Sequence, residues 1–490
     1  MLDFPILSVT ILIPFLAAIY ILAFAKSKKH VQVISFSASA LTLAVTLLLL
    51  KNFDLQAYDF QFVEQYPMIS KIGLDFFLGI DGISLLLINL MAFLGLLCVI
   101  YALSEIKHRL AEFMFFFFLL QSFIIASLAA LNLLLFYIFF EMALVPMYMI
   151  IGLWGGANRI YASYKFFLYT LASSVLFAVC IMYFYKNAST LSIPELYSIG
   201  HELDPRAQKW LWWGVFMAFA IKIPMFPFHT WLPDAHVQAP TTASAILAGV
   251  LLKLGGYGFL RILLPILPQA SKDFAIYPLI MSAVAIIYAS FAAISQKDMK
   301  KTIAYSSIAH MGFVTGGIFS FSYVGINGGI FQMLSHGLIS AALFFIVGSL
   351  YARVHTRQID SYGGLAAKMP AMASFFMIFM LSSIGLPGTS GFIGEFLCLN
   401  GLFEQHYFIS AISAFGIVLS AVYMLNLYKK VMFGKISNQV IETIADLSLQ
   451  ERFIFTLLAV AIILLGIFPN YVNKLLKPSI EIITEAIYVI

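Results

Sequence analysis

The sequence predicts an all-α, polytopic membrane protein with about 14 transmembrane helices. Three observations favour this class: 62% of the 490 residues are hydrophobic, only 10% are charged, and apolar runs of about 20 residues alternate with short polar segments. An ordinary soluble domain carries about 25% charged residues. The composition therefore excludes a soluble enzyme and leaves little chain for a large soluble domain.

The apolar runs place the spans in order along the chain. They lie near residues 4–25, 31–50, 79–103, 112–131, 132–153, 161–186, 209–231, 240–264, 273–296, 301–322, 324–352, 371–403, 407–433 and 452–470. The first run is too long for a secretory signal and has no basic region before it, so we interpret it as a span. The tail, 471–490, alternates apolar and polar residues, which is typical of an interfacial helix.

Two spans contain residues that interrupt a helix. The seventh has Pro224 and Pro227 near its end, and the twelfth has Gly385 and Pro387 in its middle. Proline removes a backbone donor and clashes with the preceding turn. Interrupted backbone at membrane depth is tolerated only where it is buried in protein or lines a watered cavity. The sequence therefore predicts broken helices at spans 7 and 12.

The two breaks occupy matching places if spans 4 to 8 and spans 9 to 13 are two five-helix repeats. An odd number of spans per repeat inverts the second, as in transporters whose ion sites lie at discontinuous helices. The predicted divisions are an N-terminal three-helix region (1–111), a first repeat (112–264), a second, inverted repeat (273–435), and a last span with its interfacial tail (436–490). The alternative is a chance pairing of two Pro- and Gly-rich helices.

Basic residues in the connections predict the orientation. If the connection between the first two spans is cytoplasmic, that side receives most of the 28 lysines and arginines. This excess places both termini on the outer side of the membrane. Three lysines, Lys165, Lys222 and Lys253, fall within spans instead.

Ionisable residues within spans are the candidate functional groups, because a charge near the bilayer centre costs about 2.5 kcal/mol or more. Glu141 lies about ten residues into span 5, which is roughly 15 Å deep. Lys222 and Lys253 lie in spans 7 and 8, at similar depths if those helices are antiparallel, and Glu395 follows the break of span 12. We expect the lysines to form a layer with Glu141.

Three histidines extend this set along the middle of the protein. His310 and His336 lie within spans 10 and 11, and His229 follows the break of span 7. Desolvation favours the neutral form of a lysine, whereas an ionised glutamate within about 6 Å favours the charged form. Moving Glu141 away from Lys222 would therefore release a proton, and histidines, with an unperturbed pKa near 6.5, suit a relay.

Structural roles are the alternatives for these residues. Glu141 and the two lysines could form a static ion pair, and the histidines of spans 10 and 11 could simply hydrogen-bond two helices. His229 and His236 could cap helix ends beside a bend. Lys165, near Arg159, could extend to the interface.

Five stretches resemble a known family, the antiporter-like, proton-pumping membrane subunits of respiratory complex I. They are FLGIDGISLLL (77–87), FFEMALVPMYMIIGLWGGANRIYASYKFFLYT (139–170), MFPFHTWLPDAHVQAPTTASAILAGVLLKLGGYG (225–258), SQKDMKKTIAYSSIAHMG (295–312) and LPGTSGFIGEF (386–396). The resemblance covers roughly residues 75–435. In one of the three paralogous types the broken twelfth helix carries glutamate where the others carry lysine, and Glu395 resembles that type.

The resemblance implies fourteen helices, two inverted repeats and a proton path. It implies that Glu141 and Lys222 are the coupled pair of a first half-channel, that Lys253 is the central relay, and that Glu395 is the outer group of a second half-channel. It also implies that the histidines of spans 10 and 11 link these groups. Span 13 has no ionisable counterpart of Lys253, which limits the internal symmetry.

By the same resemblance, the chain is a subunit of an H⁺-translocating NADH:quinone reductase and carries no redox chemistry itself. Its three cysteines lack C-x-x-C spacing, and we find no dinucleotide or Walker motif. FMN, iron-sulfur clusters and quinone are expected in partner subunits.

The expected partners are other membrane subunits of complex I, including antiporter-like paralogues, with lipid and protons but not nucleic acid, in a bacterial inner membrane with both termini periplasmic. The alternatives are a subunit of a multi-subunit cation/proton antiporter and a structural spacer that moves no ions.

Overall fold

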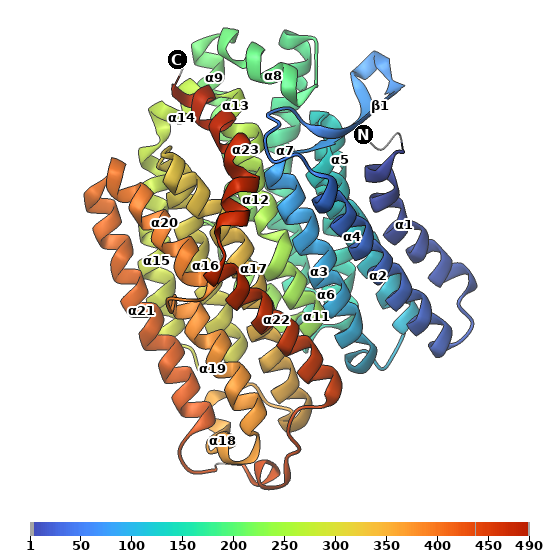
Figure 1. Ribbon diagram of the computed structural model, residues 1–490, viewed down its shortest axis with the longest axis vertical. Helices are drawn as coiled ribbons and strands as arrows, with labels where there is room; N and C mark the ends of the chain where they lie inside the picture. The colour runs from blue at the N-terminus through green and yellow to red at the C-terminus, as the bar shows by residue number, and fades with distance from the viewer. Residues whose placement is uncertain (1–3, 437, 489–490) are drawn as a thin grey trace.

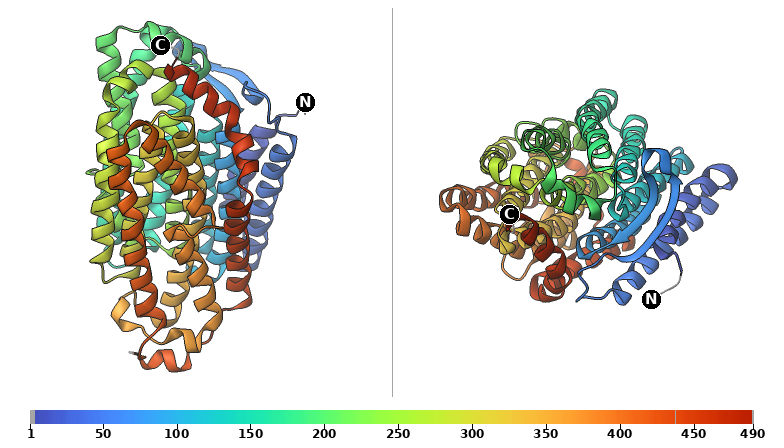
Figure 2. Two further views of the ribbon diagram at one scale, coloured as in Figure 1. Left: turned by 60° about the vertical axis from the view of Figure 1, so that its left-hand side comes forward. Right: turned by 90° about the horizontal axis from the view of Figure 1, so that it is seen from above.

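The computed structural model describes residues 4–436 and 438–488 as a tall bundle of helices (Figure 1). Most helices run along the long axis of the molecule, and both ends of the chain lie near the same, upper end (Figure 2). The predicted mostly helical, polytopic class is confirmed.

The spanning helices follow the predicted order. They are α1 (Ile6–Phe24), α2 (Lys28–Asn52), α3 (Gly82–Glu105), α4 (Leu110–Ala129), α5 (Leu133–Met142) with α6 (Leu144–Trp154), α7 (Arg159–Ala188), α9 (Pro205–Lys222) with α10 (Trp231–Gln238), α11 (Thr241–Ile246) to α13 (Leu264–Ile266), α15 (Ile276–Ile294), α16 (Met299–Phe319), α17 (Tyr323–Val354), α19 (Pro370–Ile384) with α20 (Ser390–Gln405), α21 (Tyr407–Met432) and α22 (Leu449–Ile467). In the described residues, 11 helices are long and apolar enough to cross a membrane. The α9–α10 pair, α16 and the α19–α20 pair pack among them and complete the predicted set.

Shorter elements lie between and after the spans. They are the strands β1 (Gln61–Ile69) and β2 (Leu74–Ile80), the helices α8 (Ile193–Ile199), α14 (Pro268–Phe274), α18 (Leu365–Lys368) and α23 (Asn470–Tyr488), and the 3₁₀ turns η1 (Ser70–Ile72), η2 (Gly200–Glu202), η5 (Ile359–Ser361) and η6 (Gln439–Thr443). The division of the chain into 1–111, 112–264, 273–435 and 436–490 stays a prediction.

A β-hairpin between α2 and α3 departs from the all-α prediction. Strands β1 and β2 pair antiparallel, with Glu64 opposite Leu78. The Glu64 carboxylate accepts hydrogen bonds from the backbone N–H groups of Leu7 (2.7 Å) and Ser8 (3.2 Å) at the start of α1. A carboxylate is favourable at a helix N-terminus, where backbone donors lack partners. The hairpin therefore holds the start of the first span in place. A search for apolar runs of about 20 residues could not predict this hairpin.

Both predicted breaks are present. The seventh span is interrupted between Lys222, where α9 ends, and Trp231, where α10 begins. The twelfth is interrupted between Ile384 and Ser390, and Gly385 there has a φ of +85°, a conformation that glycine adopts without strain. The broken helices at spans 7 and 12 are thus confirmed.

Two irregular stretches were not predicted. The fifth span is interrupted at Ala143, two residues after Glu141, because Pro146 has no N–H to bond the carbonyl of Met142. The eighth contains two π-helical segments, η3 (Leu247–Leu251) and η4 (Phe259–Leu263), on either side of α12 (Lys253–Gly258). Such π segments occur often at functional sites.

The predicted tail helix is α23, and residues 489–490 lie outside the described part of the chain. Its buried apolar residues recur every three or four positions, which is the pattern of an amphipathic helix. They are Val472, Leu475, Leu476, Ile480, Ile483 and Ile487. This face packs on α3, α13 and α17, so the tail helix joins both halves of the bundle.

A buried ion pair joins the start of α3 to the eighth span. Asp81 is the N-cap of α3 and accepts from the Ser84 N–H at 2.9 Å. The same carboxylate lies 2.5 Å from the guanidinium of Arg261, and the side chains are only 10% and 5% exposed. Removing one partner of a buried pair leaves an uncompensated charge, which costs more than losing an exposed pair.

We therefore predict that Asp81→Asn, which keeps the cap acceptor but removes the charge, destabilises the folded chain by about 3 kcal/mol. The melting temperature of the purified protein in its assembly should fall by several degrees. Asp273→Asn is the control, because Asp273 and Lys209 form an exposed pair at 3.3 Å that is worth at most about 1 kcal/mol. Equal melting temperatures for the two variants would contradict this role for Asp81.

Candidate functional site

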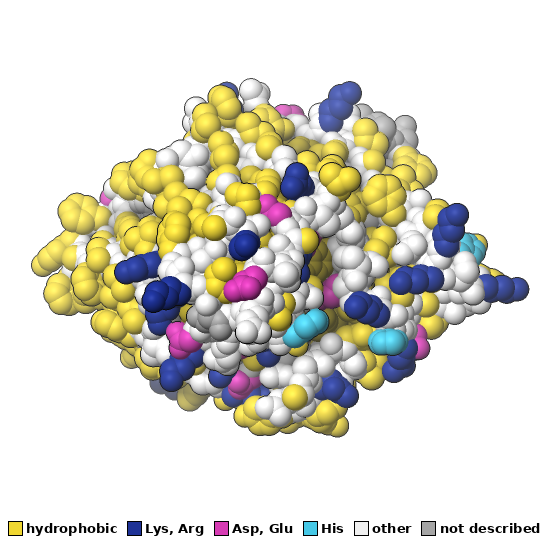
Figure 3. Space-filling model, turned by 90° about the horizontal axis from the view of Figure 1, so that it is seen from below, with side chains coloured by type: hydrophobic (Ala, Val, Ile, Leu, Met, Phe, Trp, Pro, Cys, Tyr) yellow, Lys and Arg dark blue, Asp and Glu magenta, His cyan; other side chains and the backbone are white. Residues whose placement is uncertain are grey.

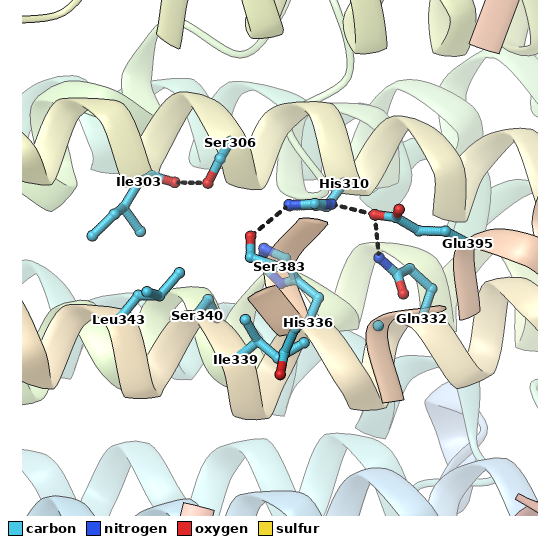
Figure 4. Close-up of a pocket in the computed structure, with 12 residues that line it drawn as sticks. Ile303, Ser306, His310, Gln332, His336, Ile339, Ser340, Leu343, Ser383 and Glu395 are labelled. Atoms are coloured by element: carbon cyan, nitrogen blue, oxygen red, sulfur yellow. Dashed lines mark hydrogen bonds and ion pairs between the residues drawn. The ribbon is translucent and has the colours of Figure 1, made fainter. Parts of the chain in front are cut away.

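Four ionisable side chains form a row through the centre of the bundle. Lys253 of α12 donates a hydrogen bond from Nζ to Nδ1 of His336 in α17, at 2.8 Å, and another to the carbonyl of Ala248. The His336 ring lies 5.6 Å, centre to centre, from the ring of His310 in α16. Nδ1 of His310 lies 2.7 Å from Oε1 of Glu395 in α20 (Figure 4). All four residues are buried.

The hydrogen bonds define which atoms can exchange protons. Because Lys253 donates to Nδ1 of His336, a neutral His336 carries its proton on Nε2, and that nitrogen has no partner among the described residues. The proton between His310 and Glu395 can reside on either group. Nε2 of His310 lies 3.3 Å from the Ser383 hydroxyl. A buried row of alternating donors and acceptors can pass a proton without moving a helix.

A small cavity lies between the two histidines and Glu395. Its lining includes Gln332 and Ser383, and Gln332 Nε2 donates to Glu395 Oε1 at 3.2 Å (Figure 4). The cavity volume is about 10 Å³, close to the space that one water molecule needs. A single water could therefore bridge the gap between the imidazole rings.

Close backbone approach at two glycines sets the position of Glu395. A Cβ at Gly391 would overlap the backbone of Ser382, and one at Gly394 would overlap Gln332 of α17. Because neither glycine has a side chain, α20 packs directly on α17 and on the end of α19. The GFIGEF segment thus brings Glu395 within reach of His310.

Lys222 and Glu141 lie near each other but form no ion pair within 4.0 Å. The Lys222 Nζ is buried, has no hydrogen-bond partner among the described residues, and lies 4.0 Å from the centre of the Phe140 ring. Oε1 of Glu141 likewise has none within that part of the chain. Glu141 as a residue is half-buried, whereas its Oε1 atom is buried, and its expected layer with the lysines stays a prediction.

His229 lies apart from the central row. Its ring stacks on Phe226 at 5.5 Å and meets the Tyr288 ring edge-on at 5.3 Å. In the described structure no hydrogen bond joins it to Lys222 or Lys253. The predicted relay through His229 stays a prediction.

Lys165 forms an ion pair with the broken seventh span. Its Nζ lies 2.7 Å from the carboxylate of Asp234 in α10, and the lysine side chain is 19% exposed. This contact ties α7 to the far side of the broken seventh span.

Sequence reasoning missed Lys300 and His236. Lys300, which we assigned to a loop, is buried and donates to the carbonyl of Ala239 (2.7 Å) and to the Ser244 hydroxyl (3.3 Å). His236 is not an exposed helix cap, because it is fully buried and stacks on Phe344 at 4.6 Å. Helical periodicity does not link Lys300 to His310, because ten residues along α16 leave the two side chains about 80° apart around the helix axis.

Comparisons with known proteins show the family and the fold of this chain. Residues 130–420 match the family described as NADH:quinone oxidoreductase/Mrp antiporter, TM. NADH-quinone oxidoreductase subunit M of Rickettsia bellii (strain RML369-C) is 52% identical over 487 residues, which cover 98% of this chain and 99% of the relative.

Two solved structures share the fold. A chain of respiratory complex I from Thermus thermophilus with bound NADH has a TM-score of 0.90 and 29% identity, covering 99% of this chain and 100% of that one. A chain of the Mrp complex from Dietzia sp. DQ12-45-1b has a TM-score of 0.87 at 18% identity, covering 100% and 98%, and shows the fold alone. The family match over more than half of the chain, with 52% identity over nearly all of it, shows that this chain belongs to the NADH-quinone oxidoreductase subunit M family.

Proposed function

We propose that this chain translocates protons in the membrane arm of an NADH:quinone oxidoreductase. Electron transfer takes place in other subunits, which hold the FMN, iron-sulfur clusters and quinone. Conformational or electrostatic change reaches this chain and moves protons through its buried Lys, His and Glu residues. The row Lys253, His336, His310 and Glu395, with a water-sized cavity beside its two histidines, is the observation that carries the proposal.

The row supports a transfer in defined steps. When Lys253 gives a proton to Nδ1 of His336, the ring can release its Nε2 proton toward the cavity. A water there can deliver that proton to His310, which shares it with Glu395 through the 2.7 Å contact. After one transfer, each group has to regain its starting protonation state, and the proton for this comes from the side that supplied Lys253. The row thereby joins the eighth span to the broken twelfth.

Lys222 and Glu141 serve as the control element for this row. A lysine with no hydrogen-bond partner in a dry site favours its neutral form, unless a carboxylate approaches. Lys222 in this structure has its Nζ against an aromatic ring, and its distance to the Glu141 carboxylate exceeds the 4.0 Å limit of an ion pair. A displacement that brings the two side chains together therefore changes which of them holds the proton.

A neighbouring membrane subunit covers the face that carries Glu141. Glu141 is a half-buried residue of the fifth span, beside the exposed apolar residues Met142 and Val145, and its Oε1 atom is buried. Leaving the rest of this side chain against hydrocarbon is costly, so a polar partner on this face would stabilise it. An antiporter-like paralogue in the same membrane arm supplies that partner.

The protein lies in a bacterial inner membrane with both termini in the periplasm. Both termini lie at the upper end of the bundle (Figure 1). Lys and Arg side chains are spread over the lower face (Figure 3). An excess of basic residues marks the cytoplasmic side of a membrane protein, so the lower face is cytoplasmic.

The competing functions predict different experimental results. A cation/proton antiporter subunit would purify in a redox-inactive assembly, and a spacer would tolerate apolar residues at the positions of the row. We expect an affinity-tagged chain to copurify with NADH-oxidising, quinone-reducing activity. Purification in an assembly without that activity would support the antiporter instead.

We predict that Glu395→Gln lowers coupled NADH oxidation and proton pumping by roughly tenfold, because the amide cannot share a proton with His310. The assembled complex should remain intact, since Gln keeps the shape of the side chain. Glu404→Gln on the same helix is the matched control, because Glu404 is exposed, and it should behave like the wild type. Wild-type rates of coupled NADH oxidation and proton pumping in an assembled Glu395→Gln complex would remove this residue from the mechanism.

Lys222→Met and Glu141→Gln should each lower coupled activity to a similar extent while NADH oxidation by artificial acceptors persists. Each change removes one of two ionisable groups, and the distance between these two groups determines which of them holds the proton. Lys209→Met, at an exposed site on the same helix α9, is the control and should leave proton uptake by membrane vesicles unchanged. Full coupled activity in an assembled Lys222→Met complex would show that the lysine is structural.

A further inference from the structure

The ammonium of Lys222 lies over the face of an aromatic ring. Its Nζ is 4.0 Å from the centre of the Phe140 ring, and within the described residues it has neither a hydrogen bond nor an ion pair. A ring face carries negative charge density and attracts a cation within about 6 Å, most strongly where water is excluded. Lys222 and Phe140 are only 3% and 1% exposed. The ring face therefore supplies an electrostatic contact for a lysine that has no other polar contact in the described part of the chain.

Two further aromatic rings hold the Phe140 ring in place. Phe136, one turn earlier on α5, stacks on it with 5.4 Å between ring centres and 24° between ring planes. Phe219 of α9 meets it edge-on at 5.8 Å. Both neighbours are fully buried, and Phe219 lies three residues before Lys222 on the same helix. Because the interior is close-packed, the Phe140 ring cannot turn away from the lysine unless these neighbours also move.

The eighth span packs against the same aromatic group. A Cβ at Gly258 of α12 would overlap the Phe219 ring, so the missing side chain lets α12 contact that ring directly. The ring centre of Tyr257, the preceding residue, lies 6.3 Å from that of Phe136. The position of the Phe140 ring therefore depends on the helix that carries the central lysine of the row.

Phe140 and Glu141 offer Lys222 two different partners from adjacent positions of α5. Consecutive side chains leave a helix about 100° apart around its axis, so the ring and the carboxylate point in different directions. In this structure the ammonium lies on the ring, and its distance to the carboxylate exceeds 4.0 Å. An ammonium over the ring face is therefore held apart from the carboxylate.

We propose that Phe140 is the positioning residue for Lys222, and that its ring face holds the ammonium away from Glu141 between transfers. This inference rests on the proposed function, in which the spacing of Lys222 and Glu141 controls the row. It adds an aromatic partner to that pair. Phe140 exchanges no proton itself and acts only through the lysine.

The test weakens the attraction of the ring for a cation while keeping the shape of the ring. Phe140 is replaced with 4-fluoro-, 3,5-difluoro- and 3,4,5-trifluorophenylalanine by incorporation of noncanonical amino acids. Each fluorine withdraws electron density from the ring face and changes the volume of the ring little. In complexes that migrate at wild-type size on native gels, we expect coupled proton pumping to fall with each added fluorine, to about threefold below wild type for the trifluoro ring.

Phe136 is the matched control. It is a buried member of the same aromatic group on the same helix, but no lysine or arginine lies over its ring in the structure as described. The same three fluorinated residues at this position disturb ring packing to a similar extent without contacting the ammonium. We therefore expect these complexes to pump protons at the wild-type rate.

The outcomes separate this role of Phe140 from the proposed function. Lys222→Met and Glu395→Gln are measured in the same kind of vesicles. If both lose pumping while every fluorinated Phe140 complex pumps at the wild-type rate, the positioning role is wrong and the proposed function stands. A loss that does not grow with the number of fluorines, or that is equal for Phe136, would assign the ring to packing and overturn the inference. If Lys222→Met and Glu395→Gln pump normally, the proposed function itself fails.

Discussion

Every ionised group in the hydrocarbon layer must find its counter-charge or its hydrogen bonds inside the protein, and this constraint organises the whole chain. Arg261 satisfies this constraint through its ion pair with Asp81, and Glu395 satisfies it through its contacts with His310 and Gln332. Lys222 has neither an ion pair nor a hydrogen bond within the described residues. The unsatisfied group is the one whose protonation is most easily shifted, which is why a signal from a neighbour can act there.

Irregular backbone accompanies each of the proposed proton-carrying carboxylates and lysines. Lys222 is the last residue of α9, Lys253 follows a π segment, and Glu395 lies one turn into the helix that resumes after Gly385. Glu141 precedes the interruption at Ala143. Such irregularities free carbonyl groups, and one of these, on Ala248, accepts from Lys253. Charged residues and helix interruptions therefore occur together. An interrupted helix offers the charged side chain backbone polar groups that an intact helix would use in its own hydrogen bonds.

Hydropathy and the Pro and Gly clusters were sufficient to predict the spans, the two broken helices and the residues of the central row. They could not predict the β-hairpin or the π segments, because these depend on contacts between distant segments. The burial of Lys300 was missed because its neighbours, Lys297 and Lys301, made the segment look like a loop. Glu141 stays a predicted member of the layer with the two lysines. Its depth along the helix was predictable, but the direction of its side chain depends on which helices pack around α5.

The close packing at Gly394 has a genetic consequence. A methyl group there would press on Gln332 and, through it, on the hydrogen bond that orients Glu395. A random screen for inactive variants should therefore recover substitutions at small, uncharged residues as readily as substitutions at acidic and basic residues. Mutational tolerance across this region follows the available volume as much as it follows acid–base chemistry.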